Sequence, residues 1–251
     1  MATFIWHELN TTDPKAAADF YGTVVGWTTQ AYEGGDGAYR LFVAGGHPAG
    51  GLMTLPAMAR EVGPWWATYI GVTDVDAEAE AIRAAGGTVH VPPADIPTVG
   101  RFAVVADPQG AVFMILAPLP RDDTPARVPF GTPGHIGWHE LHTSDEAAAF
   151  AFYAARFGWE KGEAMDMGPA GTYQIFNIDG TMAGGMMKSP LPRPLWLPYF
   201  IVADIDAAAT AIAHGDGKIK HGPSEVPGGG FIIQGTDPQG AMFAVTGPRK
   251  N

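Results

Sequence analysis

Short apolar runs alternate with alanine-rich amphipathic segments along the whole chain. "TFIWHEL" (3–9) and "WATYIGV" (66–72) are two such runs, and each leads to an aspartate and then to a stretch with helical periodicity. The first helix is predicted over Pro14–Val24, because Asp13 is a good N-cap and proline suits the first helical position. Its apolar residues fall on one stripe, as in a helix that packs on a sheet: Ala17, Phe20, Tyr21 and Val24.

The later helices follow the same rules. Asp74 and Asp204 are predicted to open two of them, and Gly86 and Gly215 to follow their ends in the left-handed conformation. Three shorter strands are expected after each helix. The last two strands are joined by "ADPQGA" or "TDPQGA", where proline at the second and glycine at the fourth turn position favour a type I turn. The pattern predicts β-α-β-β-β, four times over.

The chain also repeats itself. "IWHELNTTDPKAAADFYGTVVGW" (5–27) matches "GWHELHTSDEAAAFAFYAARFGW" (137–159), and "PWWATYIGVTDVDA" (64–77) matches "PLWLPYFIVADIDA" (194–207). Ordered blocks at a nearly constant offset indicate two copies of one domain.

A proline-rich segment separates the copies. No regular element survives the close spacing of prolines in "APLPRDDTPARVPFGTPGH", so it is predicted to be a linker. We expect one domain over residues 1–118, a linker over 119–134, and a second domain over 135–248.

Composition narrows the class of protein. A formal charge of −11 argues against nucleic acid as a partner, which requires clustered basic residues. No apolar run approaches the roughly 18 residues of a membrane span, and the first residues do not resemble a signal peptide, so a cytoplasmic location is expected. Cysteine is absent, which excludes disulfides and thiolate sites.

The motifs resemble those of a known family. Paired β-α-β-β-β modules, "FY…GW" closing the first helix of each copy, and "DPxG" before the last strand are similar to the vicinal oxygen chelate superfamily, which includes glyoxalase I, drug-resistance proteins and extradiol dioxygenases. The resemblance implies an α+β fold of two tandem glyoxalase-like domains, each of paired βαβββ modules whose curled mixed sheets form a cleft. It also implies that many members hold a divalent metal with His and Glu.

The usual metal ligands are missing here. Relatives place ligands seven residues before each helix-opening aspartate and seven residues after the aspartate of "DPxG". A fourth position, near residues 39–43, cannot be placed. The three placed positions in each copy hold no suitable ligand, so neither a metal nor another cofactor is expected. They are Trp6, Ala67, Met114, Trp138, Leu197 and Ala244.

The strand "WHEL" places its residues on two faces. Side chains alternate along a strand, so Glu8 and Glu140 are expected to face the clefts while His7 and His139 face the helical layer. Shielded by tryptophan, the two glutamates are candidate general bases. The other residues predicted on the ligand-binding face are Trp6, Asn10, Tyr69, Met114, Trp138, His142 and Tyr199.

Plainer interpretations stand beside these. In these, Trp6 and Trp138 are core residues that fill space, and Glu8 and Glu140 are carboxylates that only accept hydrogen bonds. Glu140 and His142 form an i, i+2 pair that lacks a third metal ligand, for which His221 and Glu225 are available. "AGGLM" and "AGGMM" lack the features of a P-loop and favour a tight turn or bulge.

Three functions follow from these alternatives. The first is a protein that binds a small aromatic or hydrophobic molecule in metal-free clefts, with proton transfer by glutamate as possible chemistry. The second is a metal-dependent glyoxalase-type lyase, isomerase or dioxygenase. The third is an interaction scaffold without catalysis. The identity of the ligand is not encoded in any motif, and either a monomer or a homodimer suits four modules in one chain.

Overall fold

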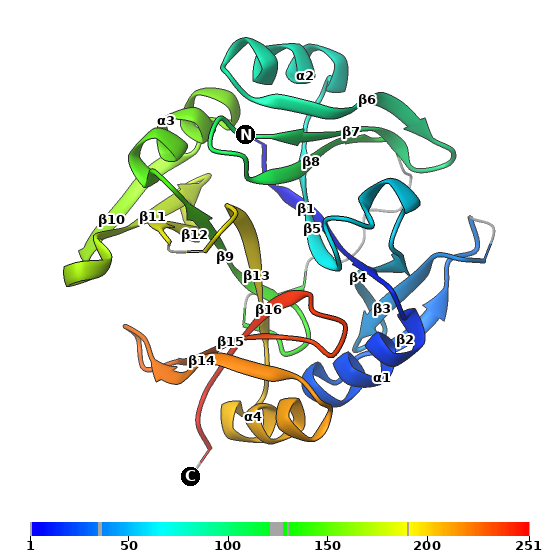
Figure 1. The fold of residues 1–251 in the computed structure, drawn as a ribbon, viewed down its shortest axis with the longest axis vertical. Coiled ribbons are helices and arrows are strands. Elements are labelled where there is room, and N and C mark those ends of the chain that lie inside the picture. The colour runs from blue at the N-terminus through cyan, green and yellow to red at the C-terminus, as the bar shows by residue number, and fades with distance from the viewer. Residues whose placement is uncertain (1, 35–36, 121–127, 130, 190, 251) are drawn as a thin grey trace. The chain divides into compact units, whose positions relative to one another are not determined.

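The computed structural model describes residues 2–34, 37–120, 128–129, 131–189 and 191–250. Four modules follow one another along the chain, each a strand, a helix and three further strands, as the sequence predicts (Figure 1). Residues 121–127 and 130 of the predicted linker lie outside the described residues. Among the helices that the structure describes, none has the length and apolar character needed to span a membrane.

The first half of the chain holds two modules. The first consists of β1 (Phe4–Thr11), α1 (Pro14–Val25), β2 (Thr28–Ala31), β3 (Arg40–Ala44) and β4 (His47–Thr54), followed by the 3₁₀ turn η1 (Ala57–Ala59). The second consists of β5 (Trp65–Gly71), α2 (Val75–Ala84), β6 (Thr88–Ile96), β7 (Gly100–Ala106) and β8 (Val112–Pro118).

The second half repeats this order. The third module consists of β9 (Ile136–Thr143), α3 (Glu146–Phe157), β10 (Glu160–Asp166), the 3₁₀ turn η2 (Gly168–Ala170), β11 (Thr172–Ile178) and β12 (Thr181–Lys188). The fourth consists of β13 (Leu195–Ile201), α4 (Ile205–His214), β14 (Lys218–Glu225), β15 (Phe231–Thr236) and β16 (Met242–Gly247).

Each half contributes one mixed eight-stranded sheet. The strand orders are β2-β3-β4-β1-β5-β8-β7-β6 and β10-β11-β12-β9-β13-β16-β15-β14. In every module the first strand pairs in parallel with the last, and the remaining ladders are antiparallel. The α+β class and the fourfold βαβββ pattern are thus confirmed.

Packing groups the modules differently from the sheets. Most of the second and third modules, with the first six residues, form one compact unit. Most of the first and fourth modules form the other. Each unit has its own buried apolar cluster, to which both of its modules contribute. Helix α1 packs on α4 in one unit, and α2 packs on α3 in the other.

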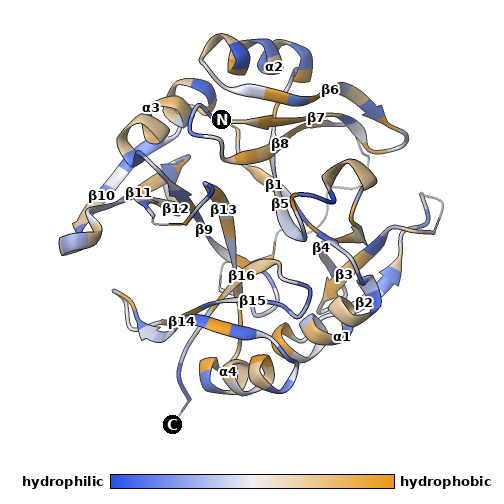
Figure 2. Ribbon diagram, in the orientation of Figure 1, coloured by the Kyte–Doolittle hydropathy of each residue, from blue (hydrophilic) through white to orange (hydrophobic). Residues whose placement is uncertain are grey.

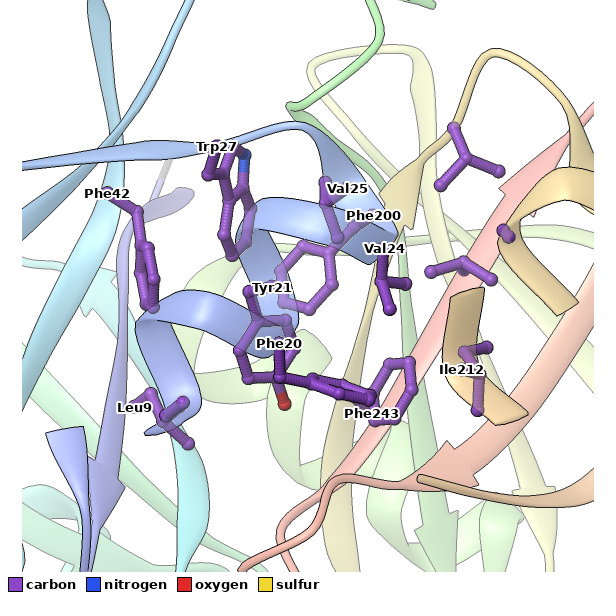
Figure 3. Close-up of a cluster of buried hydrophobic side chains, with 14 of the residues drawn as sticks. Leu9, Phe20, Tyr21, Val24, Val25, Trp27, Phe42, Phe200, Ile212 and Phe243 are labelled. Carbon is purple, nitrogen blue, oxygen red and sulfur yellow. The ribbon is translucent and has the colours of Figure 1, made fainter. Parts of the chain in front are cut away.

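Aromatic side chains fill both cores. In the unit of the first and fourth modules, Tyr21 lies among Trp27, Phe42, Phe200 and Phe243, with ring centroids 5.6–6.2 Å away (Figure 3). In the other unit, helix α2 turns only one face inward, burying Val75, Ala79 and Ile82, and Figure 2 shows its mixture of hydrophilic and hydrophobic residues. Burial of one apolar stripe is what holds each short helix in place.

A buried Trp–Tyr–Asp network ties the modules of each unit together. Tyr153 of α3 accepts a hydrogen bond from Trp196 Nε1 (2.9 Å) and donates one to Asp107 Oδ2 (3.1 Å). Asp107 opens the "DPQG" turn, and its other oxygen accepts from Ala111 N at 2.8 Å. The second unit repeats the network at the same distances with Trp66, Tyr21 and Asp237.

Burial within these networks raises the pKa values of the aspartate and tyrosine side chains. Burial raises the pKa of Asp107 above its ordinary value, although backbone N–H groups and Tyr153 partly oppose the rise. Burial likewise raises the pKa of Asp237, and it holds the pKa of both tyrosines well above the usual range. The phenols therefore remain protonated donors. The predicted turn is also confirmed, since Gly110 N donates to Asp107 O at 2.9 Å.

Helix boundaries follow the predicted caps, with one exception. Asp13, Asp74 and Asp204 all accept hydrogen bonds from backbone N–H groups in the first turn of their helices. Gly86 adopts the left-handed conformation (φ 88°) as predicted. Gly215 does not, because it is the C-cap itself with φ −89°.

The left-handed residue after α4 is Asp216, with φ 62°. The prediction at Gly215 was therefore one residue early. Aspartate tolerates this conformation better than most residues, so a glycine is not required there.

The two "AGG" segments lie inside strands β4 and β12, each beside an irregular register. A side chain at Gly184 would collide with the His139 carbonyl and the Phe176 ring. A side chain at Gly185 would collide with the ring of Tyr173. The bulge interpretation is confirmed, and the glycines serve close packing.

Candidate functional site

Strand β9 turns alternate side chains to opposite faces, as predicted. Leu141 is fully buried in the core cluster of its unit, and the ring of His139 stacks on Phe4 with centroids 3.7 Å apart. Trp138, Glu140 and His142 occupy the other face, because side chains along a strand alternate. There they meet Tyr173 from β11 and Ser189 at the end of β12.

A chain of hydrogen bonds ends on the Glu140 carboxylate. Trp138 Nε1 donates to the Tyr173 hydroxyl at 2.7 Å, and this hydroxyl donates to Glu140 Oε2 at 2.9 Å. Gly185 is paired with Glu140 in the neighbouring strand, and its missing side chain leaves room for the Tyr173 ring. Glu140 is only 5% exposed, so this donor offsets part of its desolvation.

The phenol is electrostatically fixed as a donor. Burial, and then the nearby charge of Glu140, raises the pKa of Tyr173 far above its ordinary value. The hydroxyl therefore keeps its proton at any physiological pH, and it presents that proton to Glu140.

His142 connects this carboxylate to a hydroxyl. Its Nε2 lies 2.7 Å from Glu140 Oε1, and its Nδ1 lies 2.9 Å from Ser189 Oγ. The Nε2 contact is short but not aligned as a hydrogen bond, which leaves that buried atom without a hydrogen-bond partner. The imidazole is 5% exposed. A small ring rotation toward Glu140 would convert the contact into a charge-assisted hydrogen bond.

A cavity of about 140 Å³ adjoins His142. Its walls come from the end of β9, the segment after β12, and the "DPQG" turn of the second module. The lining residues are Gln109, His142, Thr143, Ser144, Ser189, Leu191, Pro192, Arg193 and Pro194. All of them belong to the compact unit of the second and third modules.

The first copy of "WHEL" has an asparagine beside its glutamate. Glu8 is 7% exposed, and Asn10 Nδ2 donates to its Oε1 at 3.3 Å. The first copy therefore holds an amide where the second holds an imidazole. Leu55 stands in the first copy where Ser189 stands in the second.

The remaining predicted residues lie on strands in smaller groups. Tyr69 and Met114 are paired across the parallel strands β5 and β8, and both are buried. Tyr199 accepts a hydrogen bond from Gln234 Nε2 at 2.6 Å. Trp6 and Trp138 remain partly exposed and belong to neither core cluster, which disfavours simple core packing.

The two histidines of "WHEL", His7 and His139, pack on the core side of their strands. His139 Nδ1 lies 3.1 Å from the Ala183 carbonyl, and desolvation lowers its pKa to about 4. His7 is buried on the same face of β1 as the core residue Leu9. Neither histidine shares a strand face with the neighbouring glutamate.

The donor set does not fit the divalent metal of the related enzymes. Among the described residues, no group of three or more His, Cys, Asp and Glu side chains is arranged to hold an ion. Glu140 and His142 supply only two ligands, and these face each other directly. His221 and Glu225, named from the sequence as additional ligands, are exposed on β14.

The sequence pattern did not single out four residues of this site, namely Tyr173, Ser189, Gln109 and Arg193. A signal for Tyr173 existed, because "GAYRLF" (37–42) and "GTYQIF" (171–176) place a tyrosine at the same point of both copies. Gln109 stands in a motif that was interpreted only as a turn. Nothing in the sequence pattern pointed to Ser189.

Comparison with known proteins agrees with this architecture. The chain matches the family model "Glyoxalase/Bleomycin resistance protein/Dioxygenase superfamily" twice, over residues 3–115 and 133–245. It is 33% identical to "Putative glyoxylase CFP32" of Mycobacterium bovis, covering 97% of this chain and 94% of that protein. It is 31% identical to "Anthracycline biosynthesis protein DauV" of a Streptomyces species, covering 96% and 91%.

Solved structures show the same fold. The Mn(II)-bound glyoxalase from Novosphingobium aromaticivorans superposes with a TM-score of 0.65 at 18% identity, covering 98% of this chain and 82% of that one. The 2,3-dioxygenase LapB from a Pseudomonas species also gives 0.65, at 13% identity and 98% and 92% coverage. With two family-model matches, four βαβββ modules and a relative that is 33% identical over 97% of its length, this chain belongs to the glyoxalase/bleomycin resistance protein/dioxygenase superfamily.

Proposed function

We propose that this protein binds a small organic molecule and transfers a proton on it without a bound metal. The observation that carries the proposal is the buried contact between Glu140 and His142, with His142 at the wall of a cavity. The names of the curated relatives, a glyoxylase and a protein of anthracycline biosynthesis, support a small organic ligand.

His142 is the acid–base group in this proposal. The imidazole lines the cavity, whereas Glu140 is held behind it by Tyr173 and is not part of the lining. His142 accepts the proton at Nδ1, which lies beside the cavity-lining Ser189, and a carboxylate 2.7 Å from Nε2 stabilises the imidazolium that forms. Glu140 is then a positioning residue for His142, a change from its predicted role as the base itself.

The two copies have unequal roles. Asn10 donates a hydrogen bond to Glu8, and its amide does not titrate, whereas the corresponding His142 does. We assign proton transfer to the second copy and ligand binding alone to the first. The partly exposed Trp6 and Trp138 offer apolar area for a planar or hydrophobic ligand.

Deuterium exchange tests this function. The chelator-treated full chain is incubated in D₂O with hydroxyacetone, dihydroxyacetone, lactaldehyde or pyruvate, and NMR follows loss of the proton next to the carbonyl. We expect exchange above background with at least one probe. His142→Gln is expected to lower the exchange rate about 100-fold or more, the usual contribution of a general base.

His221→Gln is the matched control, since it removes an exposed histidine of the same chain. Its exchange rate should equal that of the unmodified protein. Unchanged exchange in His142→Gln, no exchange with any probe, or activity that appears only after Mn²⁺, Zn²⁺ or Fe²⁺ is added would each overturn the proposal.

A further inference from the structure

We propose that the cavity beside His142 is a subsite for a short carboxylic acid with a 2-hydroxy or 2-oxo group, and that Arg193 binds its carboxylate. The inference rests on the proposed function, because it names the class of molecule that His142 would meet. It adds a recognition residue, Arg193, that lies outside the acid–base pair.

The size of the cavity limits the ligand. A volume of about 140 Å³ equals that of roughly five liquid waters at ~30 Å³ each. It is well below the 300–1,000 Å³ typical of pockets for drug-sized ligands. A molecule of about six non-hydrogen atoms, such as a three-carbon acid, is the expected scale of the occupant.

The charge of the lining selects an anion. Among the described lining residues Arg193 is the one arginine or lysine, and no carboxylate in the described part of the chain lies within ion-pair distance of it. Arg101, Arg156 and Arg249, in contrast, form ion pairs with acidic side chains. A planar guanidinium without such a partner can bind a carboxylate through two parallel hydrogen bonds.

The polar residues near Arg193 favour a ligand that carries a second polar group beside its carboxylate. Ser144 and Ser189 line the cavity with Arg193, and the Ser189 hydroxyl lies 2.9 Å from His142 Nδ1. A hydroxyl or carbonyl on the carbon next to the carboxylate would lie within the same small volume as the imidazole. Gln109 Oε1 has no hydrogen-bond partner among the described residues, but neither has Gln239 Oε1 in the other copy, so this atom does not discriminate.

The loop that carries Arg193 is particular to the second copy. Arg193 stands between Pro192 and Pro194, which restrict the backbone on both sides. The corresponding loop of the first copy carries Arg60, which is exposed as Arg193 is. Arg60 therefore provides a matched control for the loss of one surface charge.

Ligand-observed NMR titration of the full chain at low salt tests the subsite with lactate, pyruvate, propionate, hydroxyacetone and inorganic phosphate as probes. We expect lactate and pyruvate to bind with Kd near 1 mM, a strength typical of so small a molecule. Propionate should bind more weakly because it lacks the second polar group, and uncharged hydroxyacetone should bind weakest. Arg193→Gln should raise the Kd for lactate at least tenfold, whereas Arg60→Gln should leave it unchanged.

Several outcomes would overturn the subsite. For the variants, these are an unchanged Kd for lactate in Arg193→Gln with a native thermal midpoint, or an equal loss of lactate affinity in Arg60→Gln. For the probes, they are tighter binding of phosphate than of lactate, or binding of hydroxyacetone as tight as that of lactate. Absence of binding of either acid at 20 times the expected Kd would have the same meaning. Binding is measured without turnover, so it separates the two proposals. Arg193-dependent binding without any proton exchange would retain the subsite and refute the proposed function, and His142-dependent exchange with an unchanged KM for pyruvate in Arg193→Gln would do the reverse.

Discussion

The two copies of "WHEL" lie on corresponding strands, β1 and β9, but differ in the side chains beside the glutamate. Both place a buried glutamate on the face opposite the core, at 7% exposure for Glu8 and 5% for Glu140. Two residues further along the same face, the first copy has Asn10 and the second has His142. The amide can only hydrogen-bond to its glutamate, whereas the imidazole can also exchange a proton with a ligand. Asn10 in place of His142, together with Leu55 in place of Ser189, thus distinguishes the surroundings of the two glutamates.

The largest expected effect comes from making the second copy resemble the first. His142→Asn should lower the rate of proton exchange by about 100-fold or more, because asparagine cannot accept the proton. Asn10→His, alone in the unmodified protein, should change that rate by less than about twofold, since Leu55 offers no hydroxyl to orient the new ring. Deuterium exchange in both variants checks this, and a comparable loss from any change at Asn10 would contradict the assigned asymmetry.

The next effect concerns the histidine of "WHEL" itself. Desolvation holds the pKa of His139 at about 4, against 6.5 for an exposed histidine. The resulting stability is present above pH 6.5 and is lost as the pH falls toward 4, because the unfolded chain then binds the proton first. The loss should reach about 3 kcal/mol at ~1.4 kcal/mol per pKa unit.

Urea denaturation between pH 4 and 7.5 measures that loss, with His139→Asn as the comparison. Only the pH-dependent difference between the two proteins is informative, since the variant also loses the stack on Phe4. The raised pKa values of Asp107 and Asp237 act in the opposite direction but are common to both proteins, so they cancel. A difference that stays constant with pH would refute the neutral state of His139 in the folded protein.

The smallest expected effect tests where the copies are equivalent. Tyr153→Phe and Tyr21→Phe each remove a hydroxyl that joins a tryptophan to a buried aspartate at 2.9 and 3.1 Å. Each should cost about 2 kcal/mol of unfolding free energy, because two buried polar groups lose a partner. Thermal and urea unfolding of the two variants should agree within about 0.5 kcal/mol. A large difference between the two losses of unfolding free energy would show that the two networks do not contribute equally to stability.

Local sequence determined much of this protein. Asp13 and Asp74 open their helices because a cap depends only on the next three residues. Strand alternation put Glu140 opposite His139 for the same local reason. The repeat predicted two copies of one domain, and the cap and turn signals within each copy predicted the βαβββ modules that the structure shows.

Tertiary structure decided the rest. Tyr173 reaches Glu140 from a different strand, across Gly185, and that contact depends on strand order and register. The cavity draws Gln109 and Arg193 together from positions 84 residues apart in the chain, and no periodicity within either segment encodes their proximity. The grouping of the first module with the fourth, and of the second with the third, also arises from packing of apolar faces, which is non-directional and carries no label in the sequence.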